Sequence, residues 1–206
     1  MRLHSSGLVL ALPFILVAAV CAAAHAQTDI ALSGYGAFGN TTNTIVTGNI
    51  PFTEIPSNSA GGMVELRHIS NPLVGYEATY GFNRANQVYL GNCTFCEPVV
   101  VSADAHEITG DWLISAHAAN LRAFALAGIG LLLTEPTSGQ SNTTSSNEPV
   151  YVYGAGLDWG LLPHLGLRFQ YRGNFHRAPD ITTAYGTSAL AFTHTAEPMI
   201  GAYFRF

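Results

Sequence analysis

Residues 165–175 read LGLRFQYRGNF, and their side chains alternate between apolar and polar or small types. Successive side chains of a strand point to opposite faces, so Leu165, Leu167 and Phe169 share one face. Arg168 and Arg172 share the other. A period of two over this length is the sequence signature of a β-strand. The stretch therefore predicts a strand with one apolar, partly aromatic face and an opposite face that carries charge.

The same alternation recurs along the chain in stretches of about ten residues, each bounded by Gly, Pro, Asn or Ser. Two of the stretches, 29–39 and 121–132, have apolar or small residues on both faces, so the alternation does not assign their inward face. The predicted strands are residues 29–39, 61–69, 74–82, 105–116, 121–132, 150–160, 165–175 and 192–206.

The connections between these strands alternate between short and long ones. The short turns are residues 70–73, 117–120 and 161–164, and the long polar connections are residues 40–60, 83–104, 134–148 and 176–191. This alternation is typical of outer-membrane barrels, in which short turns face the periplasm and long loops face outside. The sequence predicts an all-β protein, an eight-stranded antiparallel up-and-down transmembrane β-barrel with four exposed loops.

The composition agrees with such a barrel and excludes other classes. Only 10% of the 206 residues are charged, whereas soluble domains carry about 25%. The eight basic residues are all Arg, and the formal net charge is −5. A disordered chain needs more charge and less hydrophobicity. A nucleic-acid binder would present basic patches, so no nucleic-acid partner is expected.

The first 26 residues have the pattern of a secretory signal peptide. Arg2 precedes an apolar run over residues 8–20, and residues 24–26 read AHA, an A-x-A cleavage site. The run is short for a membrane anchor and contains Pro13. We expect a cleaved signal peptide over residues 1–26 and a barrel domain over residues 27–206, located in a bacterial outer membrane.

Two cysteines fall within the barrel domain, Cys93 and Cys96, in the segment GNCTFCEP. In an exported protein a C-x-x-C pair can close a loop disulfide, form a redox site or supply half of a zinc site. The neighbouring Gly91 and Pro98 are loop residues, and no second Cys pair is present to complete a zinc site. A local loop disulfide is the favoured interpretation.

Most charges within the predicted strands fall on the face opposite the apolar one. An eight-stranded barrel has an interior only wide enough for side chains, so charges there must be paired and hydrogen-bonded. The favoured interpretation is a plug of Arg–carboxylate ion pairs, and the alternatives are an ion gate or carboxylate catalysis. The predicted lumen charge network consists of Glu65, Arg67, Glu77, Glu107, Asp111, Asp158, Arg168, Arg172 and Arg205.

The last eight residues, MIGAYFRF, resemble the C-terminal assembly signal of outer-membrane β-barrels, with matches at Gly201, Phe204 and Phe206. Residues 154–172, GAGLDWGLLPHLGLRFQYR, look like the penultimate hairpin of the small OmpA-like and OmpX-like barrels. The resemblance implies insertion by the barrel-assembly machinery with periplasmic chaperones, and contact with outer-membrane lipids. We expect a barrel without the peptidoglycan-binding domain of larger OmpA-like proteins.

Small barrels include lipid-modifying enzymes, whose sites need a nucleophile or water beside a base. Ser115, His117 and His194 form no recognisable triad, and the histidines are scattered without a ligand pair. We expect no enzymatic activity, no cofactor and no metal ion. The predicted role is structural or surface-interactive, with an unidentified extracellular ligand. The alternatives are a narrow pore for water, ions or small solutes, and a lipid-modifying enzyme.

Overall fold

The computed structural model describes residues 27–44, 51–93, 95–137, 139–183 and 191–206. The predicted signal peptide, residues 1–26, lies outside the described residues and stays a prediction. Within the described part of the chain, no helix is long and apolar enough to cross a membrane.

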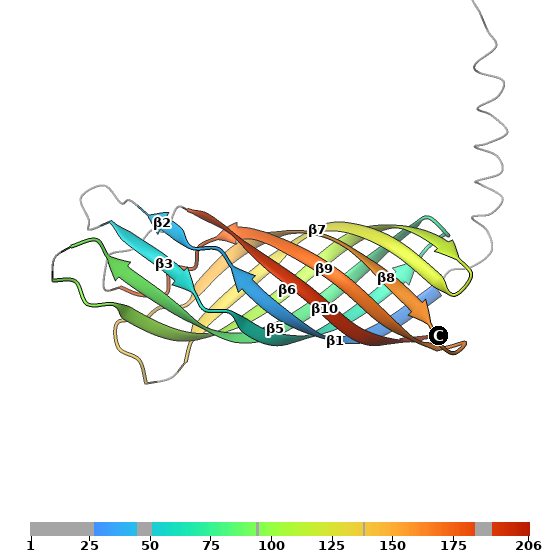
Figure 1. The fold of residues 1–206 in the computed structure, drawn as a ribbon, viewed down its shortest axis with the longest axis horizontal. Helices are drawn as coiled ribbons and strands as arrows, with labels where there is room; N and C mark the ends of the chain where they lie inside the picture. The colour runs from blue at the N-terminus through green and yellow to red at the C-terminus, as the bar shows by residue number, and fades with distance from the viewer. Residues whose placement is uncertain (1–26, 45–50, 94, 138, 184–190) are drawn as a thin grey trace, which may run out of the picture.

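Among the described residues, ten antiparallel β-strands make up the fold (Figure 1). They are β1 (Gln27–Gly39), β2 (Thr42–Thr44), β3 (Phe52–Pro56), β4 (Ser59–Ile69), β5 (Val74–Gly91), β6 (Val99–Ala118), β7 (Leu121–Pro136), β8 (Ser146–Gly160), β9 (Leu165–Arg177) and β10 (Phe192–Arg205).

Eight of these strands close into one barrel. From β4 to β10 each strand pairs with the next along the chain, and β1 pairs with both β4 and β10. In Figure 1 the strands tilt around a common axis, and the C-terminus lies at the end where the short turns are. The predicted all-β fold, an eight-stranded up-and-down antiparallel barrel, is confirmed.

The outer surface of the barrel is apolar. Leu32, Trp112 and Ile200 point outward with 69%, 68% and 57% of their surface exposed. Their strand neighbours Ser33, Asp111 and Gly201 point inward, as period-two alternation requires. An apolar exterior around a polar interior is the arrangement of a barrel surrounded by lipid, and the reverse of a soluble barrel.

Two of the predicted long loops are wrong in part, because they contain strands. Residues 40–60 contain the β2–β3 hairpin, and β3 pairs with the far half of β5. Residues 83–104 are largely the continuation of β5 and β6, which pair with each other as far as Tyr89 and Val99. Figure 1 shows these segments projecting beyond the barrel as a sheet, at the end opposite the C-terminus. We call this end the long-loop end.

A separate apolar cluster explains why the projecting sheet is ordered. Its side chains come from β3, β5, β6 and the β9–β10 connection, so burial of apolar surface holds these segments together away from the barrel core. The cluster consists of Phe52, Tyr89, Val101, Ala103 and Ile181.

Residues 178–183, the described start of the β9–β10 connection, contact the projecting sheet and the β7–β8 connection. The Tyr89 hydroxyl donates a hydrogen bond to the Pro179 carbonyl at 2.7 Å and accepts one from the Ile181 amide at 3.4 Å. The Ile181 carbonyl also accepts a hydrogen bond from the Thr144 amide at 3.2 Å, and Thr143 forms a β-bridge with Thr182. Residues 178–183 are therefore a cover, attached to β5 and to the β7–β8 connection.

Candidate functional site

The register of the barrel places opposite charges side by side in the lumen. Arg67 on β4 lies opposite Glu77 on β5, and its Nε donates to Glu77 Oε2 at 2.6 Å. Arg168 on β9 lies opposite Asp158 on β8, and its Nε donates to Asp158 Oδ1 at 2.8 Å. Period-two alternation turns these side chains inward, and cross-strand pairing brings each cation to its carboxylate.

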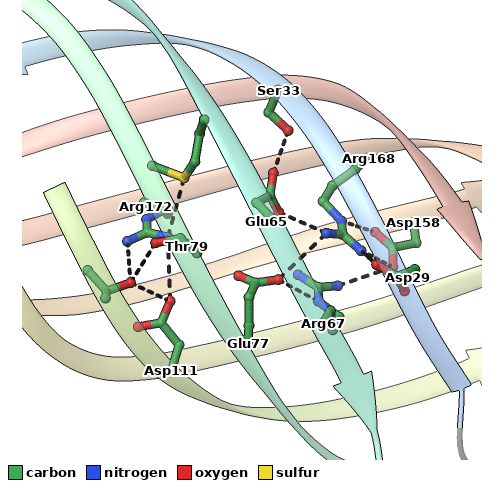
Figure 2. Close-up of polar contacts among 12 residues, drawn as sticks. Asp29, Ser33, Glu65, Arg67, Glu77, Thr79, Asp111, Asp158, Arg168 and Arg172 are labelled. Carbon is green, nitrogen blue, oxygen red and sulfur yellow. Dashed lines mark hydrogen bonds and ion pairs between the residues drawn. The ribbon is translucent and has the colours of Figure 1, made fainter. Parts of the chain in front are cut away.

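Arg168 is the centre of the first group of charges, as Figure 2 shows. Its guanidinium nitrogens lie 2.8 Å from oxygens of Asp29, Glu65 and Asp158 and 3.6 Å from Glu77. All five side chains have no exposed surface. We call this group, together with Arg67, the Arg168 cluster.

Arg67 joins the Arg168 cluster to the wall of the barrel. Besides Glu77, its Nη1 donates to Asp158 Oδ2 at 3.2 Å, across the lumen. Its guanidinium carbon lies 4.0 Å from the ring centre of Phe124, an inward aromatic residue on β7. A cation over an aromatic face is favourable, particularly where both are desolvated, so Phe124 partly replaces water around Arg67.

Arg172 forms a second group nearer the long-loop end. Its nitrogens lie 2.8 Å from Glu107, 3.4 Å from Asp111 and 3.9 Å from Glu197. Asn174 donates to Glu107 Oε2 at 2.6 Å. This Arg172 cluster therefore has three carboxylates around one guanidinium. It also includes the hydroxyls of Thr79 and Thr109, which lie 3.3 and 3.2 Å from the guanidinium.

A glycine makes room for the carboxylate of Asp111. Gly128 on β7 lies opposite Asp111, and a Cβ there would collide with the Asp111 carboxylate and the Gly110 carbonyl. Glycine at this inward position lets the carboxylate lie flat against the neighbouring strand.

The structure places the predicted network residues as follows. Glu65, Arg67, Glu77, Asp158 and Arg168 meet in the Arg168 cluster, and Glu107, Asp111 and Arg172 meet in the Arg172 cluster. Arg205 lies apart at the short-turn end, where it is partly exposed. Its guanidinium lies 5.1 Å from the ring centre of Tyr203.

Sequence reasoning missed three further lumen charges, Asp29, Arg122 and Glu197, which are all buried. Glu197 is separated from Tyr203 and Arg205 by an even number of positions, so it shares their face of the strand. Extending the alternation of that strand would have placed Glu197 in the lumen. Asp29 and Arg122 lie on the two strands whose faces the alternation left unassigned. The only indication that Asp29 and Arg122 face the lumen was their charge, because a charged side chain on the lipid-facing surface costs free energy.

Cavities lie on both sides of the charged clusters. At the long-loop end, a cavity of about 80 Å³ has Glu107, Asn174 and Glu197 among its lining residues. At the short-turn end, an open cavity of about 340 Å³ is lined partly by Asp158 and Arg205. The two clusters occupy the lumen between these spaces.

A buried carboxylate also lies in the projecting sheet, outside the membrane-spanning part of the barrel. Glu54 on β3 is 2% exposed and faces inward, beneath the cover formed by residues 178–183. Burial, and the nearby carboxylate of Asp180, raise the pKa of Glu54 to about 8. A charged form of Glu54 therefore needs a compensating cation.

The remaining predicted residues lie as follows. Cys93 and Cys96 are joined by a disulfide, with Cα atoms 5.3 Å apart, at the tip of the β5–β6 hairpin. Phe204 and Phe206 point outward at the short-turn end and are 50% and 67% exposed. Gly201 packs its inward face against Ser33.

The Ser and His residues weighed for catalysis contact other groups. The Ser115 hydroxyl points inward and donates to the Pro72 carbonyl at 3.3 Å. His194 lies on the outer surface, where it hydrogen-bonds the Tyr153 hydroxyl at 3.0 Å and contacts the Phe175 ring. These histidine contacts are of the kind found in an aromatic girdle.

No protein-family model matches the sequence, and no curated protein matches it either. Solved structures do match the fold. One is Ail, the attachment invasion locus protein of Yersinia pestis, in complex with the heparin analogue sucrose octasulfate. Its sequence is 19% identical and its TM-score is 0.52, and the match covers 88% of this chain and 99% of Ail. Neisserial surface protein A is 10% identical with a TM-score of 0.54, and the match covers 86% of this chain and 97% of that protein. OprG, an outer membrane protein of Pseudomonas aeruginosa, is 12% identical with a TM-score of 0.57, covering 88% and 96%.

At these identities the likeness concerns the fold. The chain has the fold of the small outer-membrane β-barrels, over nearly the whole length of those proteins. The predicted resemblance to the small outer-membrane barrels is thus confirmed at the level of the fold. What the barrel does there depends on its own residues.

Proposed function

We propose that this protein is an integral outer-membrane barrel with a closed lumen, which acts through the surface at its long-loop end. The observation that carries the proposal is the burial of Arg67, Arg168 and Arg172, whose side chains have no exposed surface. A water-filled channel would wet at least one of these guanidiniums. The short-turn end would face the periplasm and the long-loop end the outside.

Opening the lumen would be costly in free energy. Arg168 holds carboxylates from β1, β4, β5 and β8, so moving it separates charges on half of the barrel strands. Removing one partner of a buried ion pair typically costs about 3–5 kcal/mol, because the other charge stays desolvated. Ion pairs that fill the lumen favour a plug over a gate that opens readily.

The long-loop end has the properties of an interaction surface. It is a sheet with its own apolar cluster and a cover, so its exposed residues are held on a rigid scaffold. Binding commonly resides in such elements. Apart from the buried Glu54, the long connections carry an excess of acids over Arg, namely Glu97, Asp104, Glu135, Glu148 and Asp180 against Arg84 and Arg177.

This charge balance distinguishes the chain from a binder of sulfated polymers. The Ail structure contains a heparin analogue, a highly sulfated ligand. A surface with more carboxylates than guanidiniums repels polyanions and attracts cationic groups. We propose a partner that presents positive charge.

The conducting alternative has one observation in its favour, the cavities at both ends of the lumen. The cavities of about 80 Å³ and 340 Å³ would be the two mouths of a pore if the clusters between them rearranged. The enzymatic alternative lacks a comparable observation, since Ser115 and His194 contact other groups.

The proposed route of assembly rests on the sequence resemblance to outer-membrane barrels. We propose that residues 1–26 are removed on export and that the barrel-assembly machinery reads the last strand, with periplasmic chaperones. Gly201, Phe204 and Phe206 lie on or beside β10, which also closes the barrel against β1. The closing strand is an appropriate place for such a signal.

Single-channel recording in planar lipid bilayers tests the closed lumen. We expect no reproducible conductance steps from the purified protein, or from Arg84→Gln, a control that removes an exposed cation. Arg67→Ala/Arg168→Ala, if folded, should conduct intermittently, because two large side chains leave the lumen. Reproducible steps from the unaltered protein that change with Glu77→Gln would establish a pore instead.

A further inference from the structure

We propose that the long-loop end binds a hard divalent cation, Ca²⁺ in type, through oxygen atoms of Thr42, Glu54 and Gln87 beneath the cover formed by residues 178–183. The site lies outside the barrel lumen, so the proposal is independent of whether the lumen conducts.

Strand register brings the proposed ligands together. Thr42 on β2 lies directly opposite Glu54 on β3, and Glu54 lies opposite Tyr89 on β5. Directly opposed residues share a face and have Cβ atoms about 5 Å apart. Gln87 lies two residues before Tyr89 on the same face, a diagonal neighbour of Glu54. Three oxygen-bearing side chains thus converge on one inner surface.

These side chains line a common cavity and leave oxygens without hydrogen bonds. The cavity has a volume of about 40 Å³, and Thr42, Glu54 and Gln87 all line it. The buried atoms Thr42 Oγ1, Glu54 Oε2 and Gln87 Oε1 have no hydrogen-bond partner. Thr42 and Glu54 are more than nine-tenths buried, at 8% and 2% exposure. Unsatisfied buried oxygens are rare and are usually explained by an unseen water or ion.

The cover brings a second negative charge to the same place. Tyr89 hydrogen-bonds the residues on both sides of Asp180, namely Pro179 and Ile181. Asp180 is thereby held near Glu54, and its carboxylate adds to the effect of burial in raising the pKa of Glu54. Water alone would not balance two neighbouring carboxylates, whereas a divalent cation would.

The donor set selects the class of cation. All three ligand atoms are carboxylate, amide or hydroxyl oxygens, which Ca²⁺ prefers, whereas most zinc sites include Cys sulfur or His nitrogen. Among the described residues no group of three or more His, Cys, Asp or Glu side chains could hold a metal ion. The proposed site relies instead on neutral oxygens with few carboxylates, which predicts a weak site, with a Kd of about 10⁻⁴–10⁻³ M as in extracellular modules.

A cation here would connect three segments of the outer surface. Thr42 lies on β2, Glu54 on β3 and Gln87 on β5. Binding would hold these segments in one arrangement and stabilise the folded form by RT ln(1 + c/Kd), where c is the free Ca²⁺ concentration. This departs from the expectation, drawn from the sequence, that no metal ion is bound.

Terbium luminescence tests the site, because Tb³⁺ replaces Ca²⁺ and accepts energy from a nearby tyrosine such as Tyr89. We expect the purified protein, refolded in lipopolysaccharide-free detergent and freed of metal by chelation, to bind Tb³⁺ saturably. Ca²⁺ should displace it at millimolar concentration, and Mg²⁺ should be far less effective because it dehydrates reluctantly.

Variants test whether the cation binds at the site formed by Thr42, Glu54 and Gln87. Glu54→Gln should weaken Ca²⁺ binding by about tenfold or more, whereas Glu135→Gln, which removes an exposed carboxylate at the end of β7, should bind as the unaltered protein does. If Glu54→Gln does not fold, as judged by a heat-modifiable band, Thr42→Val takes its place and should weaken binding several-fold. No saturable binding, or equal binding by all folded variants, would overturn the proposal.

Discussion

Replacing Arg168 by glutamine should lower the free energy of unfolding by about 3–5 kcal/mol. The change leaves Asp29, Glu65 and Asp158 in the lumen without their shared cation. Unlike a surface pair, these carboxylates have no exposed surface, so water cannot replace the lost guanidinium. Glutamine offers one amide group, which cannot bond three carboxylates at once.

Urea unfolding in lipid vesicles, followed by tryptophan fluorescence, measures this effect. The matched control is Arg84→Gln, because Arg84 also pairs with a carboxylate, Asp104, but is 63% exposed. The exposed pair is solvent-screened, so the control should unfold close to the unaltered protein. If both variants lost a similar free energy of unfolding, burial would not make the lumen ion pairs more important for stability than an exposed pair.

An arginine at the outward position Leu32 should cost about 2–4 kcal/mol of folding free energy. Leu32 lies midway along β1 and is 69% exposed. If the barrel is surrounded by lipid, this surface meets hydrocarbon, where a guanidinium must shed water or distort the bilayer. In a water-soluble barrel the same substitution would be tolerated.

Leu162→Arg is the matched control for Leu32→Arg. Leu162 is almost as exposed, at 63%, but lies in the short turn between β8 and β9, where a guanidinium reaches water. Refolding yield and urea midpoint in vesicles should fall for Leu32→Arg and change little for Leu162→Arg. Equal tolerance of the two arginines would contradict a lipid-facing outer surface.

The alternation of residues 165–175 predicted the fold well for a physical reason. Along the whole length of a spanning strand, lipid requires one face to be apolar, and the charged residues lie on the other face. Arg168 and Arg172 could therefore be assigned to the lumen from sequence alone. Beyond the membrane this constraint ends. Residues 83–91 have water on their outer face, so their strand pattern is interrupted by polar residues and resembles that of a loop.

Contacts between distant parts of the chain were also beyond the sequence. Nothing local indicates that Ile181 packs against Tyr89, or that Asp180 lies near Glu54. Strand 27–39 has small or apolar residues on both faces, so Asp29 could not be assigned to the lumen by alternation. Glu197, the third carboxylate around Arg172, was also missed by sequence reasoning.

The geometry also explains why the lumen cations are arginine. Arg168 uses Nε, Nη1 and Nη2 to contact Asp158, Glu65 and Asp29 respectively. A lysine ammonium is a compact point charge with three donors on one nitrogen, so it spans less distance between carboxylates than the five N–H groups of a guanidinium. The planar fork suits a crowded lumen that several strands line.

An outer-membrane barrel is tested most directly by a semi-native gel of fractionated cells. We predict that the protein remains in the outer-membrane fraction, and that the unheated sample migrates differently from the boiled one, because a closed barrel resists unfolding by detergent. Recovery in the soluble periplasmic fraction, with no heat-modifiable band, would contradict the barrel, its lipid-facing surface and its buried lumen charges together.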